Sequence, residues 1–175
     1  MKMNQAVLTG ILLLVLENGV VPWLVPSAWS DRLLPHLTFI LTIYVACFAG
    51  RHRAFMFGLG FGLIGDLLYY GELIGPYGFG MGLIGYAAGL VQERRAPTLT
   101  FLIGLTAIGS AALSTIVYLI YYLFRLTQWS YPFAVYWYIA PSLLLELLIS
   151  LVLYLPVRRW LLRPTAPVRE EASAG

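Results

Sequence analysis

The sequence predicts an all-α polytopic membrane protein, a single compact bundle of about six transmembrane helices. Of its 175 residues, 60% are hydrophobic and only 11% are charged, and the mean hydropathy is +0.81. Soluble domains have about 45–50% apolar and about 25% charged residues. A helix needs about 20 apolar residues to cross a hydrocarbon core about 30 Å thick, so the chain has room for roughly six crossings and short loops. This composition excludes an ordinary soluble domain.

Apolar runs predict the position of each helix in order. They cover residues 5–22, 33–49, 54–70, 77–91, 98–124 and 134–156. Helix breakers lie between the runs: Pro22 and Pro26 follow the first, Gly71 to Pro76 separate the third from the fourth, and Tyr131-Pro132 separate the fifth from the sixth. Because these loops are short, we expect successive helices to pack as antiparallel neighbours.

The basic residues predict the orientation, because cytoplasmic loops carry an excess of Lys and Arg. Nine of the eleven fall at one set of helix ends: Lys2, Arg51, Arg53, Arg94, Arg95, Arg158, Arg159, Arg163 and Arg169. Only Arg32 and Arg125 lie at the other set. Both termini are therefore predicted to be cytoplasmic, with one transmembrane domain over residues 1–163 and a flexible cytoplasmic tail over residues 164–175.

An alternative interpretation makes the first 28 residues a signal peptide. Lys2 is then its basic end and Ser27-Ala28 its small-residue cleavage site. The run is long for a signal peptide, and it contains Glu17. Cleavage leaves five crossings in the same orientation.

Glycines distinguish the third and fourth predicted helices from the rest. Twelve of the 17 glycines lie between Gly50 and Gly89. At 3.6 residues per turn they form one stripe on each helix, and such stripes let membrane helices approach closely. The predicted packing residues are Gly58, Gly62, Gly65, Gly78, Gly82, Gly85 and Gly89. We expect this hairpin to be the most tightly packed part of the fold.

The two glycine stripes also repeat in sequence, since the pattern from Gly58 to Gly65 recurs from Gly78 to Gly85. One interpretation is an inverted repeat, which in transporters frames a central site. The other is independent selection of small residues at helical spacing. Both copies match the dinucleotide pattern G-x-G-x-x-G, but that pattern needs a preceding strand, so we reject a nucleotide site.

Three acidic residues fall within predicted spans, where a charged group is expensive. Glu17, Asp66 and Glu146 all lie in the predicted outer half of the bilayer, and Arg125 is the nearby cation. They form either a binding or proton-linked site, or a set of groups hydrated at headgroup depth. Our hypothesis for Asp66 is that it fixes the outer end of the third helix by accepting hydrogen bonds from an adjacent span.

Other chemistry has little support in the sequence. His36 and His52 lie near helix ends, and we expect both to be far from any cluster of ligand residues, so no metal and no cofactor is predicted. No catalytic grouping of Ser, His and a carboxylate stands out, which argues against an enzyme. The net charge of +3 is distributed as in a membrane protein, so we expect no nucleic-acid partner. The arginine pairs are suited to anionic lipid headgroups or an acidic partner.

One stretch of the chain has a familiar pattern. A proline opens the second helix and an apolar run leads to a glycine. G-x-x-x-G-L-x-x-D, a turn containing glycine, a Gly-Tyr pair and a basic loop follow. These features are Pro35, Gly50, Gly58, Gly62, Leu63, Asp66, Gly75, Gly85, Tyr86 and Arg94-Arg95. Over residues 35–95 the chain resembles the bacterial rod shape-determining MreD family.

The resemblance implies a non-catalytic scaffold in the bacterial cytoplasmic (inner) membrane, as part of the machinery for cell elongation and peptidoglycan synthesis. Its implied partners are the single-span MreC and, through that complex, MreB, the glycosyltransferase RodA and a penicillin-binding transpeptidase. The implied fold is similar to that of substrate-binding components of energy-coupling-factor transporters. Such a vitamin-binding component is the alternative function, and a small membrane enzyme is a third.

Overall fold

The computed structural model describes residues 3–19, 36–68, 73–93 and 98–161, with side chains up to Leu153. Within these ranges all regular structure is helical, which confirms the predicted all-α class. Each of the six predicted runs corresponds to a helix. The helices are α1 (Met3–Gly19), α3 (Leu37–Ala49), α4 (Arg51–Leu68), α5 (Pro76–Gln92), α6 (Leu99–Leu123), and a last helix made of α7 (Tyr131–Ala134), the π-helical η1 (Val135–Ile139) and α8 (Ala140–Leu161).

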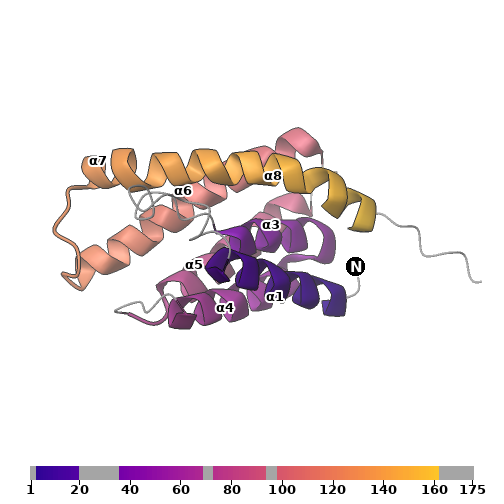
Figure 1. The fold of residues 1–175 in the computed structure, drawn as a ribbon, viewed down its shortest axis with the longest axis horizontal. Coiled ribbons are helices and arrows are strands. Elements are labelled where there is room, and N and C mark those ends of the chain that lie inside the picture. The colour runs from indigo at the N-terminus through magenta and orange to yellow at the C-terminus, as the bar shows by residue number, and fades with distance from the viewer. Residues whose placement is uncertain (1–2, 20–35, 69–72, 94–97, 162–175) are drawn as a thin grey trace, which may run out of the picture.

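Helix α3 forms the centre of the fold. Ten of its 13 residues are buried, and it contacts α1, α4, α5, α6 and α8. Figure 1 shows the long α6 and the α7–η1–α8 helix on one side of the molecule, with α1, α4 and α5 on the other. A single residue, Gly50, joins α3 to α4, and its φ of 91° lies in the region that favours glycine. The chain therefore reverses direction within one residue.

Helices α4 and α5 make the most extensive contact between any two elements. A β-carbon at Gly58 would lie 2.6 Å from the Met81 carbonyl oxygen, and one at Gly62 would lie 2.6 Å from the Gly78 Cα. Because these neighbours are backbone atoms, they have no rotamer with which to move aside. The two helices can approach this closely only if glycine occupies these positions.

Glycines on α5 extend the same contact. A β-carbon at Gly89 would lie 2.5 Å from the Arg51 Cα, one at Gly85 would lie 3.0 Å from the Ala54 carbonyl oxygen, and one at Gly82 would lie 3.3 Å from the Leu59 Cβ. At the same end of the hairpin, Arg51 Nη1 lies 3.3 Å from Glu93 Oε2. This pair connects the start of α4 with the end of α5.

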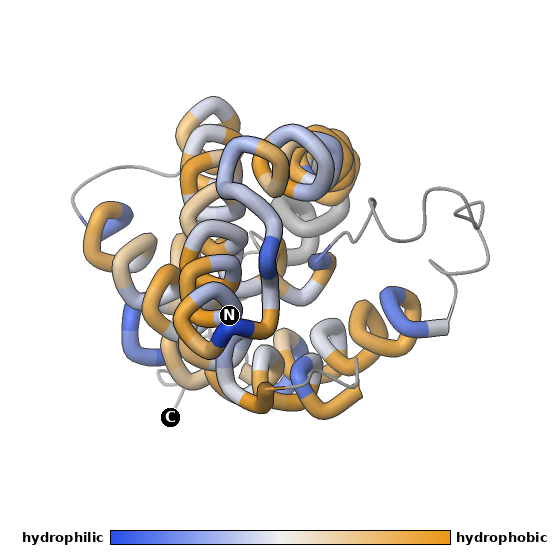
Figure 2. The backbone as a smooth tube through the Cα atoms, turned by 90° about the vertical axis from the view of Figure 1, so that its left-hand side faces the viewer, coloured by the Kyte–Doolittle hydropathy of each residue, from blue (hydrophilic) through white to orange (hydrophobic). Residues whose placement is uncertain are grey.

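Two segments of the described chain are long and apolar enough to cross a bilayer, Leu99–Leu123 and Tyr131–Leu153. Helix α3 is apolar but has only 13 residues. The six crossings and the cytoplasmic termini therefore stay predictions. Helices α1 and α8 both present apolar side chains outward, among them Leu8, Leu12, Leu144 and Leu148, and hydrophobic colour predominates over much of the tube in Figure 2.

Several predicted features lie outside the described residues. They are the turn prolines Pro22 and Pro26, the alternative cleavage site at Ser27-Ala28, the cytoplasmic tail 164–175, and Lys2, Arg32, Pro35, Arg94, Arg95, Arg163 and Arg169, together with the side chains of Arg158 and Arg159. Of the basic residues that predict the orientation, only Arg51 and Arg53 have described side chains. They occupy the first turn of α4.

Candidate functional site

The carboxylate of Asp66, near the end of α4, receives three backbone N–H groups from the start of α5. Gly75 and Gly78 donate to Oδ2 at 3.0 Å each, and Tyr77 donates to Oδ1 at 3.3 Å. Between these donors lies Pro76, which has no N–H. Asp66 therefore satisfies all the backbone donors of residues 75 to 78.

This arrangement addresses a general cost of beginning a helix. The first N–H groups of a helix have no partner within it, and inside a bilayer no water replaces them. Gly75 precedes α5 but has no side chain with which to cap it. The negative charge of Asp66, which is 3% exposed, also complements the positive end of the helix dipole. An acid on one helix thus stabilises the start of the next.

Glu17 of α1 performs the same task at the start of α3. Its Oε2 accepts from both the backbone N–H and the hydroxyl of Thr38, each at 3.3 Å. Its Oε1 lies 3.5 Å from Nδ1 of His36. A third acid, Glu146 of α8, accepts from the His36 backbone N–H through Oε1 at 3.2 Å. All three buried acids therefore lie at helix N-termini, two at α3 and one at α5.

The basic group at this cluster is His36, which corrects two expectations. His36 was expected to lie far from any potential ligand residues, yet it contacts Glu17 and Glu146, and its ring centroid lies 4.8 Å from that of Tyr77. Arg125 was expected to be the cation of the cluster. It follows the end of α6 with a φ of 58° and lines a hollow with Leu119 and Thr127. Among the described side chains, the ion pair at the acids is made by His36 and not by Arg125.

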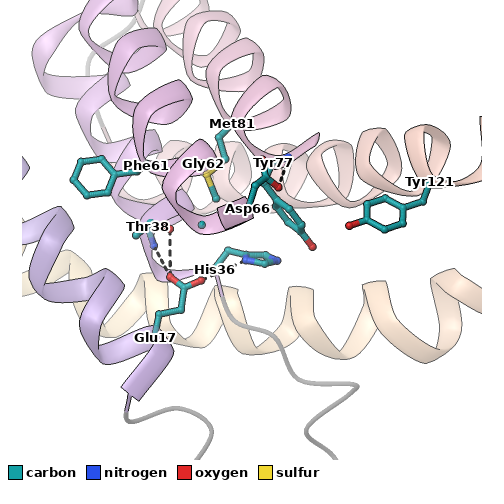
Figure 3. Close-up of a pocket in the computed structure, with 10 residues that line it drawn as sticks. Glu17, His36, Thr38, Phe61, Gly62, Asp66, Tyr77, Met81 and Tyr121 are labelled. Atoms are coloured by element: carbon teal, nitrogen blue, oxygen red, sulfur yellow. Dashed lines mark hydrogen bonds and ion pairs between the residues drawn. The ribbon is translucent and has the colours of Figure 1, made fainter. Parts of the chain in front are cut away.

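A cavity of about 190 Å³ opens beside these groups. Its polar lining includes Glu17, His36 and Asp66, and the side chains of Tyr77 and Tyr121 also face it, as Figure 3 shows. A larger hollow of about 460 Å³ shares His36, Tyr77 and Tyr121 with the cavity. Sequence reasoning missed both tyrosines, because neither is charged and tyrosine is frequent in this chain.

Gly65 differs from the other glycines of the predicted stripes. No atom lies within 4 Å of the position that its β-carbon would take, and the residue lines the cavity. Its expected contact with α5 is therefore wrong. The reason is that Gly62 already lies opposite Tyr77 and Gly78, in the first turn of α5. Beyond Gly62, the longer side chain of Asp66 still reaches the start of α5, whereas Gly65 lines the cavity instead.

The described side chains include no group of three His, Cys, Asp or Glu residues arranged to hold a metal ion. Within that part of the chain, the three acids instead receive hydrogen bonds from helix starts. The arrangement joins α1 and α8 to the start of α3, and α4 to the start of α5. It is built to fix helices to one another at one end of the bundle.

Comparison with known families decides the identity. A family model for the rod shape-determining protein MreD matches residues 1–163. The chain belongs to the MreD family. The match includes every helix of the fold, so it extends well beyond residues 35–95, where the sequence pattern first indicated it.

Membership of the MreD family implies a role in determining rod shape, in a structural membrane protein of bacteria. No curated protein and no solved structure matches the chain. The expected similarity of the fold to energy-coupling-factor components therefore stays a prediction. For this MreD family member, the polar cluster and the outward helix faces are the features that carry a functional argument.

Proposed function

We propose that this chain is a non-catalytic scaffold of the cell-elongation machinery, a multi-pass protein of the bacterial inner membrane with both termini in the cytoplasm. It binds MreC and connects it with RodA, a penicillin-binding transpeptidase and MreB. The observation that carries the proposal is the MreD family match over residues 1–163. A scaffold needs surfaces for partners and a body that keeps those surfaces in place.

Two features of the fold support this role. Gly50 alone joins α3 to α4, and the described helices present large apolar side chains outward, such as Leu12, Ile108 and Val152. A partner with a membrane helix meets these faces before it meets anything polar. Inside the body, the acids that cost most to bury accept hydrogen bonds from helix starts, as at Asp66. They hold the helices in register, so that the outer faces keep their positions for partner proteins.

The test is to solubilise the tagged full-length chain gently from its native membrane and identify co-purifying proteins by mass spectrometry. We expect MreC to be enriched over a control membrane protein of similar size and abundance, together with wall synthases. Enrichment of transporter ATPases and a coupling subunit, without MreC, would contradict the scaffold and establish the vitamin-transport alternative.

A further inference from the structure

The cavity beside His36 is large enough for a ligand. Its volume of about 190 Å³ exceeds the roughly 150 Å³ of an engineered cavity that holds benzene. Phe61 and Met81 supply apolar walls. Gly65 adds no side chain, and no atom lies within 4 Å of where its β-carbon would be. The space therefore accepts a body about the size of one six-membered ring.

The charges around the cavity favour a cation. Glu17 and Asp66 both line it, and Glu146 bonds to the backbone of the same His36. Among the described residues that line the cavity and the adjoining hollow, the only basic one is His36, and the two acids Glu17 and Asp66 outnumber it even though it is paired with Glu17. An anion is repelled here, whereas a cation meets complementary charge.

Aromatic residues beside the cavity also favour a cation. The hydroxyl groups of Tyr77 and Tyr121 point toward one another beside His36 in Figure 3. The adjoining hollow adds Tyr118, Trp129 and Tyr138. The faces of such rings attract cations, and ammonium ligands are commonly recognised in this way. The hollow that shares His36, Tyr77 and Tyr121 with the cavity is therefore rich in aromatic residues.

We propose that this cavity binds a small organic cation, an ammonium group carried on an apolar body of about one ring. The ammonium group faces Glu17 and Asp66, and the apolar body lies against Phe61 and Met81. A free amine and the amine headgroup of a lipid share this chemistry. The proposal is independent of the scaffold role, since it concerns the interior of the fold and not the outward faces.

The first experiment titrates benzylammonium into the full-length chain in a neutral maltoside detergent, followed by isothermal calorimetry. Two compounds of similar shape serve as controls. Benzyl alcohol has no charge, and benzoate has a negative charge. We expect saturable binding of benzylammonium at one site, binding of the alcohol weaker by about tenfold or more, and no binding of benzoate. Equal affinity for all three, or no binding of benzylammonium, overturns the proposal.

Two glycines of α4 provide a matched pair of variants. Gly65→Leu fills the cavity from a position with no neighbouring atoms, whereas Gly60→Leu adds the same side chain at an equally open position that does not line the cavity. We expect Gly65→Leu to abolish benzylammonium binding and Gly60→Leu to leave it unchanged. If both variants bind benzylammonium with similar affinity, the amine partitions into the micelle, and the proposed site is wrong.

A charge variant separates the carboxylate from the shape of the cavity. Glu17→Gln keeps the side-chain size but removes the charge. The affinity for benzylammonium should therefore fall by about tenfold, while that for benzyl alcohol stays the same. Equal loss of both affinities contradicts the proposed role of Glu17.

A competition experiment distinguishes a free amine from the amine headgroup of a lipid. Added phosphatidylethanolamine displaces benzylammonium only if the site binds a lipid headgroup, and phosphatidylglycerol is the control. The Gly65→Leu variant is also tested for co-purification of MreC. If it loses amine binding but still co-purifies MreC, the cation site and the scaffold role are separate.

Discussion

At the scale of single residues, Asp66 is the side chain that connects α4 to the start of α5. Replacing it by alanine leaves the N–H groups of Gly75, Tyr77 and Gly78 without their acceptor. A buried group left unpaired costs about 1–3 kcal/mol, so we expect Asp66→Ala to lower the free energy of unfolding by on the order of 3 kcal/mol or more. Reversible unfolding of the purified chain in mixed micelles measures this change.

The matched control for that variant is Asp66→Asn. It keeps an acceptor oxygen in the same place, so its loss of stability should be clearly smaller than that of Asp66→Ala. If the two variants unfold alike, or if Asp66→Ala matches the wild type, the carboxylate does not hold the start of α5.

Arg125 gives a second test at this scale. It has a φ of 58°, which is costly for a residue with a β-carbon, by roughly 1–2 kcal/mol. We therefore expect Arg125→Gly to raise the free energy of unfolding by about 1 kcal/mol, with Arg125→Ala as control for loss of the charge. If instead both variants destabilise the chain equally, Arg125 does act as a cation for the buried acids.

The sequence predicts the contacts of single residues where a local pattern exists. It does not predict contacts between residues that are far apart in the sequence. Asp66 was expected to accept hydrogen bonds from an adjacent span because it follows a glycine stripe, and it does accept them from α5. His36 meets Glu146 across 110 positions of the chain. No spacing in the sequence encodes that meeting, because it depends on how α8 packs against α3.

At the scale of elements, the contact between α4 and α5 leads to a clear expectation. A β-carbon at Gly62 meets the backbone of Gly78 at 2.6 Å, whereas one at Gly60 meets nothing within 4 Å. Gly62→Ala should push the two helices apart and cost about 1–3 kcal/mol. Gly60→Ala should stabilise the chain by roughly 0.5–1 kcal/mol, since alanine favours a helix over glycine.

Thermal unfolding in detergent compares these two alanine variants directly. The expected result is opposite shifts in midpoint, downward for Gly62→Ala and upward for Gly60→Ala. Shifts of the same sign and size would mean that the glycines of α4 serve backbone flexibility and not close packing.

The positions of the helices were predictable because apolar runs and breakers are local signals. Gly50 ends α3 and Pro76 begins α5, close to the predicted limits. The contact of Gly65 was not predictable, because helical periodicity identifies a face and does not show where the neighbouring helix ends. The apolar runs also do not establish that the shorter helices cross a bilayer. Helix α3 has 13 residues, whereas a span needs roughly 20.

At the scale of the whole molecule, polar and apolar surfaces have separate tasks. The acids near one end connect α1, α8 and α4 to the starts of α3 and α5, while large apolar side chains cover the outside. The sequence predicts the all-α class and the family from composition and a glycine pattern. It does not predict the cavity, which exists only because residues of five helices, α1, α3, α4, α5 and α6, meet beside His36.

The central claim is that this MreD family member works through its outward helix faces, and site-specific photo-crosslinking in the native membrane tests it most directly. A photoreactive residue is placed at exposed positions on four helices, Leu8, Met56, Ile108 and Leu148, and at the buried controls Phe39 and Ile43. We expect adducts with MreC from at least one exposed face and none from the buried positions. Absence of MreC adducts from every exposed face, with the chain correctly inserted, would contradict it.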